Sequence, residues 1–427
     1  MTIQTEIFNG PCSCGREHKI EVKDIILGEH AAEELLKALR NGELSGYQHP
    51  TIICDQNTRK AAIGKLKRIW QLCSEIVLPP LGLHADNHGV DMVHQAMRNN
   101  ESGREEPDLL LAVGAGTIHD LTRYVAHERG IPFVSVPTAA SVDGFVSTVA
   151  AMTWNGMKKT LPAVAPIYVF ADTDIFSKAP YRLTASGISD LMGKYVALAD
   201  WRIVHEVTGE YICERICRME MDALETVCRC LDGLQAGIAK ACENLMYALL
   251  LSGLAMQMIG NSRPASCAEH HVSHLWEMEV INDHVDALHG EKVSVGLVLN
   301  LELYKKIARS IHEGRCRVKP YEGLEDELIR ETFGAKGLYE ATIGENTPDP
   351  MLAVDSEQLE NCLPKIAQII GDLPEVDEIL TLLRQGGCVC DVGQIGLTED
   401  IIPLTMQLSP YVRNRLSFNR IQKMLVY

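Results

Sequence analysis

The chain lacks an excess of positive charge. Its 40 lysine and arginine residues are outnumbered by 57 aspartate and glutamate residues, which gives a formal net charge of -17 at pH 7. Non-specific binding to nucleic acid or to an anionic membrane depends on a cationic surface. The composition therefore argues against both partners, and an anionic substrate must be held by a few local basic groups.

The chain also lacks two features of exported proteins. Residues 1–7 show no basic region followed by an apolar core, so no secretory signal is visible. The 14 cysteines show no spacing typical of a disulfide framework. We therefore expect reduced thiols and a cytoplasmic location.

Two segments match a zinc-binding motif and a membrane span only in part. Cys12 and Cys14, followed by His18, could form half of a zinc knuckle, but no second Cys or His pair follows at suitable spacing, so a surface hairpin is favoured. The 19 residues from Asn244 to Ser262 carry no charge. Polar residues interrupt this stretch, so it predicts a buried core helix and no membrane span.

The chain of 427 residues is long enough for two domains, and it shows no internal repeat or low-complexity tract. Apolar runs alternate with helix-like stretches up to residue 176, which predicts an α/β domain with a parallel nucleotide-binding sheet. From residue 177 to 427 the spacing is helical, which predicts an all-α domain. The expected strands are 51–54, 108–113, 132–136 and 167–171, and the expected helices are 58–73, 118–128, 210–259, 293–311 and 355–369.

A glycine turn follows the second of these strands. Gly114-Ala115-Gly116 opens the helix that begins near Ile118, and glycines let the backbone approach a pyrophosphate at a helix N-terminus. The motif is incomplete, because His119 occupies the position of the third glycine, and it is weak evidence alone. No acidic residue follows at the usual distance, so Asp55, at the end of an earlier strand, is the best candidate to hold the ribose.

Histidines with the spacing of metal ligands lie later in the chain. His270 and His274 are four residues apart and share a helix face, and His289 arrives from a second segment. Imidazoles suit a borderline divalent metal, and a catalytic site typically has three protein ligands. Asp190 is a candidate for the carboxylate ligand. Each residue alone also has a plain structural explanation, such as a helix cap for Asp190.

Together these motifs resemble the iron-containing alcohol dehydrogenase and dehydroquinate synthase-like superfamily. Within it the chain resembles the sn-glycerol-1-phosphate dehydrogenases, particularly the bacterial form associated with arabinose operons. The resemblance rests on 114–120, 137–147, 186–190, 263–274 and 289–293, and it spans nearly the whole chain. It implies a dehydroquinate synthase-like fold, a homodimer and a role in phospholipid biosynthesis.

The resemblance also implies roles for individual residues. Asp190, His270 and His289 would hold a divalent metal, nickel or zinc before iron, although a shift of one residue would exchange His270 for His271. Asp143, Asp190 and His274 would face the substrate. NAD, or alternatively NADP, would be held by residues at four places: Asp55; Gly116, Thr117, Ile118, His119 and Asp120; Thr138, Ala139, Ala140 and Ser141; and Ser147.

The implied reaction is hydride transfer between NAD(P)H and dihydroxyacetone phosphate, a phosphorylated triose, to give sn-glycerol 1-phosphate. Its phosphate requires a basic clamp, for which Lys158, Lys159, Arg263 and Lys292 are candidates, although Lys158 and Lys159 are also typical of a solvated turn. Three alternatives stay open. They are a dehydrogenase of glycerol or another polyol, a dehydroquinate synthase-like lyase, and a non-catalytic binding protein with the same fold.

Overall fold

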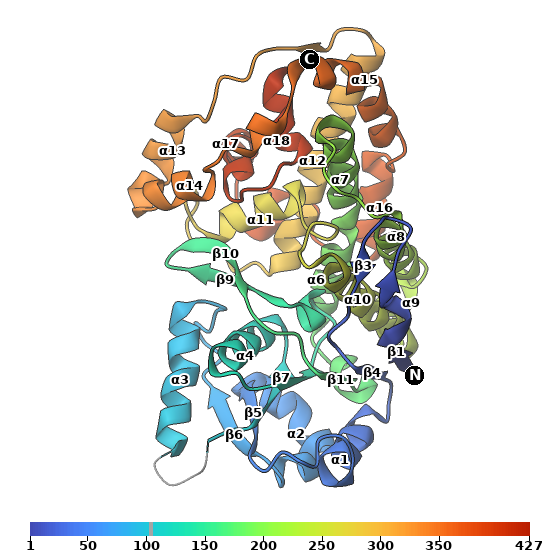
Figure 1. Ribbon diagram of the computed structural model, residues 1–427, viewed down its shortest axis with the longest axis vertical. Helices are drawn as coiled ribbons and strands as arrows, with labels where there is room; N and C mark the ends of the chain where they lie inside the picture. Colours follow the sequence, from blue (N-terminus) through green and yellow to red (C-terminus); the bar gives the residue numbers. More distant parts are fainter. Residues whose placement is uncertain (102–105) are drawn as a thin grey trace. The chain divides into compact units, whose positions relative to one another are not determined.

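The computed structural model describes residues 1–101 and 106–427 (Figure 1). By packing, the chain divides into two compact units. Unit 1 comprises residues 1–155, 159–191 and 222–261, and unit 2 comprises 156–158, 192–221 and 262–427. This division differs from one by element type, because helical segments 181–191 and 231–259 pack in the same unit as the sheet.

Unit 1 is built on a seven-stranded sheet with the order β1-β4-β11-β8-β7-β5-β6. β1 pairs antiparallel to β4, and the described pairings among the other strands are parallel. The predicted parallel sheet is therefore confirmed. Its strands are β1 (Thr2–Gln4), β4 (Asp24–Leu27), β5 (Pro50–Asp55), β6 (Ser74–Leu78), β7 (Leu109–Gly114), β8 (Phe133–Pro137) and β11 (Tyr168–Ala171).

Two apolar cores cover the faces of this sheet. On β5, Ile52 and Cys54 point into one core and Ile53 into the other, as the alternation of a strand requires. α1 and α2 close the first core, and α3 and α4 close the second. The central strands are buried on both faces and so form continuous apolar runs. The helices are α1 (Ala31–Asn41), α2 (Gln56–Trp70), α3 (Asn87–Glu101) and α4 (Gly116–Arg129).

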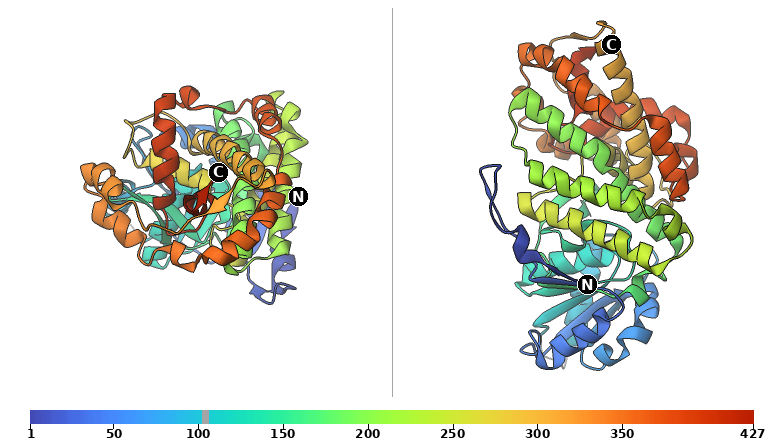
Figure 2. Two further views of the ribbon diagram at one scale, coloured as in Figure 1. Left: turned by 90° about the horizontal axis from the view of Figure 1, so that it is seen from above. Right: turned by 90° about the vertical axis from the view of Figure 1, so that its right-hand side faces the viewer.

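Several further helices and strands lie outside the sheet. The N-terminal hairpin β2–β3 is the dark-blue loop that extends away from the sheet in the right-hand view of Figure 2. The predicted helix 210–259 is three helices, and Lys158 and Lys159 lie in a strand, β10, so the prediction of a solvated turn there was wrong. The elements are β2 (Gly10–Pro11), β3 (Glu17–His18), β9 (Val149–Trp154), β10 (Met157–Pro162), α5 (Thr173–Phe176), α6 (Tyr181–Met192), α8 (Glu214–Cys228), α9 (Leu231–Gln235) and α10 (Ala239–Ile259).

α10 is the one helix of the described residues that is long and apolar enough to cross a membrane. Of its most apolar window, 78% is buried inside the protein. Length and composition alone are weak evidence for a span, and this degree of burial is what a core helix shows. Gln257, near its C-terminus, donates a hydrogen bond to the carbonyl of Val146, so the helix packs on the loop after β8.

Unit 2 is almost wholly helical. α11 and α12 cross closely, because a Cβ on Gly296 would lie 2.4 Å from the carbonyl oxygen of Glu269. Two-residue strands, β12 (Arg317–Val318) and β13 (Leu425–Val426), pair with each other. The main helices are α7 (Lys194–Thr208), α11 (Ala268–Glu277), α12 (His289–His312), α13 (Asp326–Thr332), α14 (Tyr339–Glu345), α15 (Ser356–Gly371), α16 (Val376–Gln385), α17 (Ile402–Leu408) and α18 (Phe418–Ile421).

Candidate functional site

The carboxyl edge of the sheet in unit 1 has the topology of a nucleotide site. In the register of the strands, Ile53 faces Ala112, and Gly114 faces Pro137, so the ends of β5, β7 and β8 lie side by side. The helices that follow the neighbours β5 and β7, α2 and α4, cover opposite faces of the sheet. In open α/β sheets such a reversal opens a crevice in which ligands bind.

The glycine turn lies at this crevice. A Cβ on Gly114 would lie 2.4 Å from the Cβ of Ile118, so a glycine is needed for α4 to start directly after β7. The N–H groups of the first helical turn have no acceptor within the helix. Gly116 and Thr117 therefore present N–H donors at the crevice, at the positive end of the helix dipole, where an anionic group is favoured.

The side chains of His119 and Asp120 both have partners within unit 1. The His119 ring is 1% exposed and bonds the carbonyl of Ala115 and the hydroxyl of Ser135 inside the core. Burial lowers the pKa of His119 to about 3, so the ring is neutral. Asp120 lies 3.7 Å from the Arg123 guanidinium. The His119 ring therefore supports the turn from within the core.

Asp55 is the N-cap of α2. Its carboxylate accepts the backbone N–H groups of Asn57 and Thr58 through one oxygen, Oδ1. The cap is one of the structural roles that its position at the end of a strand allows. The carboxylate remains half-buried at the crevice edge.

The loop after β8 forms a buried hydrogen-bonded group in unit 1. Residues 138–141 are at most 4% exposed, and the hydroxyl of Ser186 donates to the carbonyl of Ser141. The backbone N–H of Asp143 donates to the Asp190 carboxylate at 2.9 Å. Ser147 ends this loop, where its hydroxyl accepts the N–H of Val149.

A residue of α10, Ser252, completes this group and was not predicted from the sequence. Its hydroxyl donates to the Asp143 carboxylate at 2.9 Å. The next residue, Gly253, is required by contact, because a Cβ there would lie 2.8 Å from the carbonyl oxygen of Asp143. The polar interruption of the uncharged segment was the available signal, and it marks the side of α10 that meets the Asp143 loop.

Unit 2 brings three of the predicted histidines together. The ring centroids of His270 and His289 are 5.2 Å apart, those of His274 and His289 are 5.6 Å apart, and those of His270 and His274 are 5.9 Å apart. The helical spacing puts His270 and His274 on one face of α11, and His289 is the first residue of α12. Rings at this separation can direct nitrogens at one ion.

Two carboxylates orient these rings. Glu269 accepts a hydrogen bond from Nδ1 of His270 at 2.7 Å, and Glu277 accepts one from Nδ1 of His289 at 2.7 Å. When Nδ1 carries the proton, Nε2 keeps its lone pair, which is the tautomer that a metal ligand needs. Glu269 and Glu277 were missed, since they function through the predicted residues.

Glu277 has a second partner. Lys158 lies 2.8 Å from its other carboxylate oxygen, and the potential ligand atoms of His274, Glu277 and His289 lie within 4.8 Å of one another. Burial raises the pKa of the Glu277 carboxyl, but Lys158 and His289 outweigh it and hold that pKa well below the usual range. Glu277 is therefore an anion that positions His289.

His271 and His274 are both buried, but they differ in what surrounds them. Both ring nitrogens of His271 lack a hydrogen-bond partner among the described residues, and His271 belongs to neither the carboxylate pairs nor the ring cluster. This placement favours His270 over His271 as the ligand. Burial, and then the charge of Arg413, holds the pKa of His274 well below its usual value, so the ring is neutral.

The basic candidates for a phosphate clamp also differ. Arg263 is paired with Glu210 at 2.7 Å, and Lys292 donates to the carbonyl of Ala287. The positive charges of Lys158 and Arg413 instead both lower the pKa of His274. Burial lowers the pKa of Arg413 to about 10, which leaves it cationic at neutral pH. Arg413 was not predicted, because it lies far from the motifs in sequence.

Comparison with known proteins adds to this geometry. Residues 26–180 match the family model described as iron-containing alcohol dehydrogenase. The chain is 38% identical over 328 residues to a glycerol-1-phosphate dehydrogenase [NAD(P)+] of Bacillus velezensis, covering 72% of this chain and 79% of that protein. It is 37% identical to the enzyme of the same name from Bacillus licheniformis, covering 81% and 88%.

The fold is also that of a solved structure. Maleylacetate reductase from Rhizobium sp. strain MTP-10005 matches with a TM-score of 0.61 over 95% of both chains, at 14% sequence identity. The likeness at this identity concerns the fold, which agrees with the predicted dehydroquinate synthase-like class.

Proposed function

The chain belongs to the glycerol-1-phosphate dehydrogenase family, and we propose from this membership that it reduces dihydroxyacetone phosphate with NAD(P)H to sn-glycerol 1-phosphate, and catalyses the reverse reaction. The observation that carries the proposal is the similarity over most of the chain to relatives with that name. The sheet edge of unit 1 and the histidine cluster of unit 2 supply the two kinds of site that the reaction needs.

The cofactor is proposed to bind at the carboxyl edge of the sheet. The donors of Gly116 and Thr117 would face its pyrophosphate, and the small residues of 138–141 would let the nicotinamide end approach closely. Asp55 keeps one carboxylate oxygen outside its capping bonds for the ribose hydroxyls. An anion here repels a 2′-phosphate, which favours NAD over NADP.

One divalent metal is proposed to bind His270, His289 and Asp190. The fit rests on the chemistry of the donors, since Glu269 and Glu277 fix the tautomers that free Nε2 of the two imidazoles. Two imidazoles and a carboxylate suit nickel or zinc, and also iron. The bound metal would supply Lewis acidity that polarises the substrate carbonyl. Asp190 also accepts the N–H of Asp143, so it would fix that loop.

Proton handling is proposed for His274. Hydride addition at C2 of the ketone leaves an oxygen that must gain one proton, while the nicotinamide is oxidised. The neutral His274 ring has a buried Nδ1 without a hydrogen-bond partner among the described residues, which could meet the substrate or a water. His274 would relay the proton to that oxygen, and Asp143 would orient the substrate hydroxyl.

Substrate phosphate recognition is proposed for Lys158 and Arg413. Both are cations close enough to disfavour a positive His274, and both belong to unit 2. A dianionic phosphate would gain charge-assisted hydrogen bonds from them, which are stronger than neutral ones. We further propose that the enzyme is cytoplasmic and a homodimer. Light scattering on the purified chain would test the oligomeric state.

The test compares dihydroxyacetone phosphate with dihydroxyacetone in an NADH oxidation assay, followed by chiral analysis of the product. The proposal expects turnover of the phosphorylated ketone and the sn-glycerol 1-phosphate enantiomer. Preference for the unphosphorylated ketone would assign a polyol dehydrogenase. If neither ketone is turned over, the chain would instead be assigned as a lyase or as a non-catalytic binding protein.

A further inference from the structure

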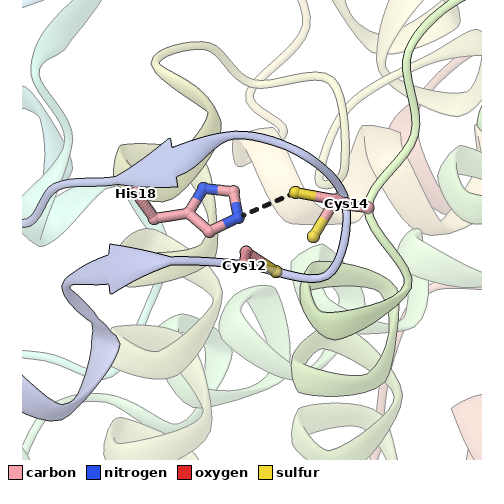
Figure 3. A group of neighbouring side chains, drawn as sticks. Cys12, Cys14 and His18 are labelled. Atoms are coloured by element: carbon pink, nitrogen blue, oxygen red, sulfur yellow. Dashed lines mark hydrogen bonds between the residues drawn. The ribbon is translucent and has the colours of Figure 1, made fainter.

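A second group of potential metal ligands lies in the N-terminal hairpin of unit 1 and shares no residue with the proposed cofactor, metal and substrate sites. The ligand atoms of Cys12, Cys14 and His18 all lie within 4.8 Å of one another. Figure 3 shows both cysteine side chains and the His18 ring turned toward the inside of the β2–β3 loop. Two thiols and an imidazole are the donors that a structural zinc site uses.

The His18 ring is fixed in the orientation that such a site needs. Its Nδ1 lies 2.7 Å from the carbonyl oxygen of Met258 on α10, so Nδ1 carries the proton and donates it. Nε2 then keeps its lone pair and lies 3.4 Å from Sγ of Cys14. Ligands of a tetrahedral zinc, at about 2.1 Å for nitrogen and 2.3 Å for sulfur, are separated by about 3.6 Å. The observed spacing needs little movement to accept the ion.

The backbone of the hairpin prepares the same geometry. Gly15 donates to the carbonyl of Cys12 and has φ +84°, a left-handed conformation that favours glycine. Cys12 in turn donates its N–H to the carbonyl of Arg16. This tight turn brings Cys14 back over Cys12, so that two thiols separated by one residue point to one side.

The strands of the hairpin are short. β2 and β3 have two residues each, and Pro11 has no N–H to donate to the ladder. Ser13, Arg16 and Glu17 are exposed, while His18 is 2% exposed. Short segments that bury little apolar surface often depend on a metal for their fold.

We propose that Cys12, Cys14 and His18 bind a structural zinc ion that fastens the N-terminal hairpin to α10. The two thiols bind as thiolates and release their protons, and His18 binds as the neutral imidazole through Nε2. A fourth donor completes the tetrahedron, as in other structural zinc sites. α10 also holds the Asp143 loop through Ser252, so the zinc supports a helix that the proposed active site uses.

The test uses the purified full chain, stripped of metal under reducing conditions and loaded with cobalt. Thiolate bound to cobalt gives a charge-transfer band in the near ultraviolet, whose intensity rises with the number of cobalt–sulfur bonds. The ligands proposed for the catalytic metal contain no sulfur, so this band reports the hairpin alone. The variants are Cys12→Ser and Cys14→Ser, with Cys228→Ser as a matched control that removes a partly exposed cysteine of unit 1 outside the cluster.

The proposal expects the band in the wild-type chain and in Cys228→Ser, with two or more sulfur ligands, and its loss in Cys12→Ser and Cys14→Ser. Zinc content measured by mass spectrometry should fall by one ion per chain in the same two variants. A wild-type chain without the band, or hairpin variants that keep its full intensity, would overturn the proposal. Protein purified without reductant could also contain a Cys12–Cys14 disulfide. If such protein takes up no zinc after the disulfide is reduced, the proposal is overturned.

A second measurement does not depend on the folding of any variant. X-ray absorption at the zinc edge of the wild-type chain should show sulfur neighbours at about 2.3 Å together with nitrogen at about 2.0–2.1 Å. A shell of nitrogen and oxygen without sulfur would contradict the proposal whatever the variants do.

Discussion

The carboxyl edge of the sheet in unit 1 and the histidine cluster in unit 2 differ in the atoms that they offer to a ligand. At the sheet edge the donors are backbone N–H groups around Gly114 and Gly116, and the neighbouring side chains, such as His119, are turned into the core. In the cluster the donors are side chains, and each of the rings His270 and His289 is held by a carboxylate.

This contrast predicts how each region responds to substitution. A site made of backbone atoms depends on the shape of the chain, so it tolerates many side-chain changes and fails where a Cβ collides. A site made of oriented side chains fails when one donor or its supporting partner is removed. The predictions below test that difference, beginning with the largest effect.

Removal of a proposed metal ligand should have the largest effect. His289→Ala should lower kcat/KM for dihydroxyacetone phosphate at least about 1000-fold, because the Lewis acid lowers the activation barrier by several kcal/mol. Steady-state NADH assays and metal analysis would measure the loss. The control His284→Ala removes an exposed histidine of the same unit, and an equal loss of activity in both variants would contradict the assignment.

Removal of a supporting carboxylate should have a smaller effect. Glu277→Gln should weaken metal binding about 10- to 100-fold, because His289 loses the acceptor that fixes its tautomer. Competition with a chelator would measure the affinity. Glu279→Gln is a matched control, since Glu279 pairs with His284 at the same 2.7 Å but on an exposed site. Unchanged metal affinity in Glu277→Gln would show that the pair is not part of the site.

A cation proposed for the phosphate should affect one substrate only. Lys158→Met should raise KM for dihydroxyacetone phosphate about 10-fold or more, because one charge-assisted hydrogen bond is lost. The residual rate with dihydroxyacetone should stay the same after correction for metal content. Lys159→Met, its neighbour in β10, is the control. Equal losses with both substrates would assign Lys158 to the support of Glu277 alone.

On the backbone side, a single methyl group should matter. Gly114→Ala should destabilise the chain by about 1–3 kcal/mol, since the new Cβ collides with Ile118. Urea unfolding would measure this change, and NADH titration would show weaker binding. Gly64→Ala lies on the exposed side of α2 with no atom within 4 Å of its Cβ, and it should stabilise the helix by up to about 1 kcal/mol.

A further effect concerns pH and the buried His119. Its pKa is about 3 in the folded chain, against about 6.5 when unfolded, so protonation favours the unfolded chain. The stability that His119 provides is complete above pH 6.5 and falls as the pH drops toward 3, by at most about 1.4 kcal/mol per unit. Urea melts at pH 7, 6 and 5 would measure how the free energy of unfolding changes with pH. It should fall less steeply with decreasing pH in His119→Gln than in the wild type, whereas the exposed His30→Gln should behave like the wild type. Parallel slopes for wild type and His119→Gln would contradict this account.

The sequence predicted the parts of the molecule that depend on local pattern. The buried strands at 51–54, 108–113 and 132–136 were found because a parallel strand covered on both faces is a continuous apolar run. The spacing of His270 and His274 predicted a shared helix face for the same local reason.

The parts that depend on tertiary contacts were missed. Glu277 reaches His289 across twelve residues, and Ser252 reaches Asp143 across 109. Neither pairing leaves a periodic pattern in the sequence. For Asp55 and His119 the sequence predicted the place but not the partner, since a helix cap and a buried hydrogen bond satisfy their polar atoms first.

The most direct test of the central claim measures metal-dependent NADH oxidation by chelator-stripped protein with dihydroxyacetone phosphate, before and after addition of nickel, zinc or iron. The account predicts negligible activity without metal, recovery on addition of one of these ions to the wild-type chain, and no recovery in Asp190→Asn or His270→Ala. Full activity in the stripped wild-type chain, or recovery in both variants, would contradict the account.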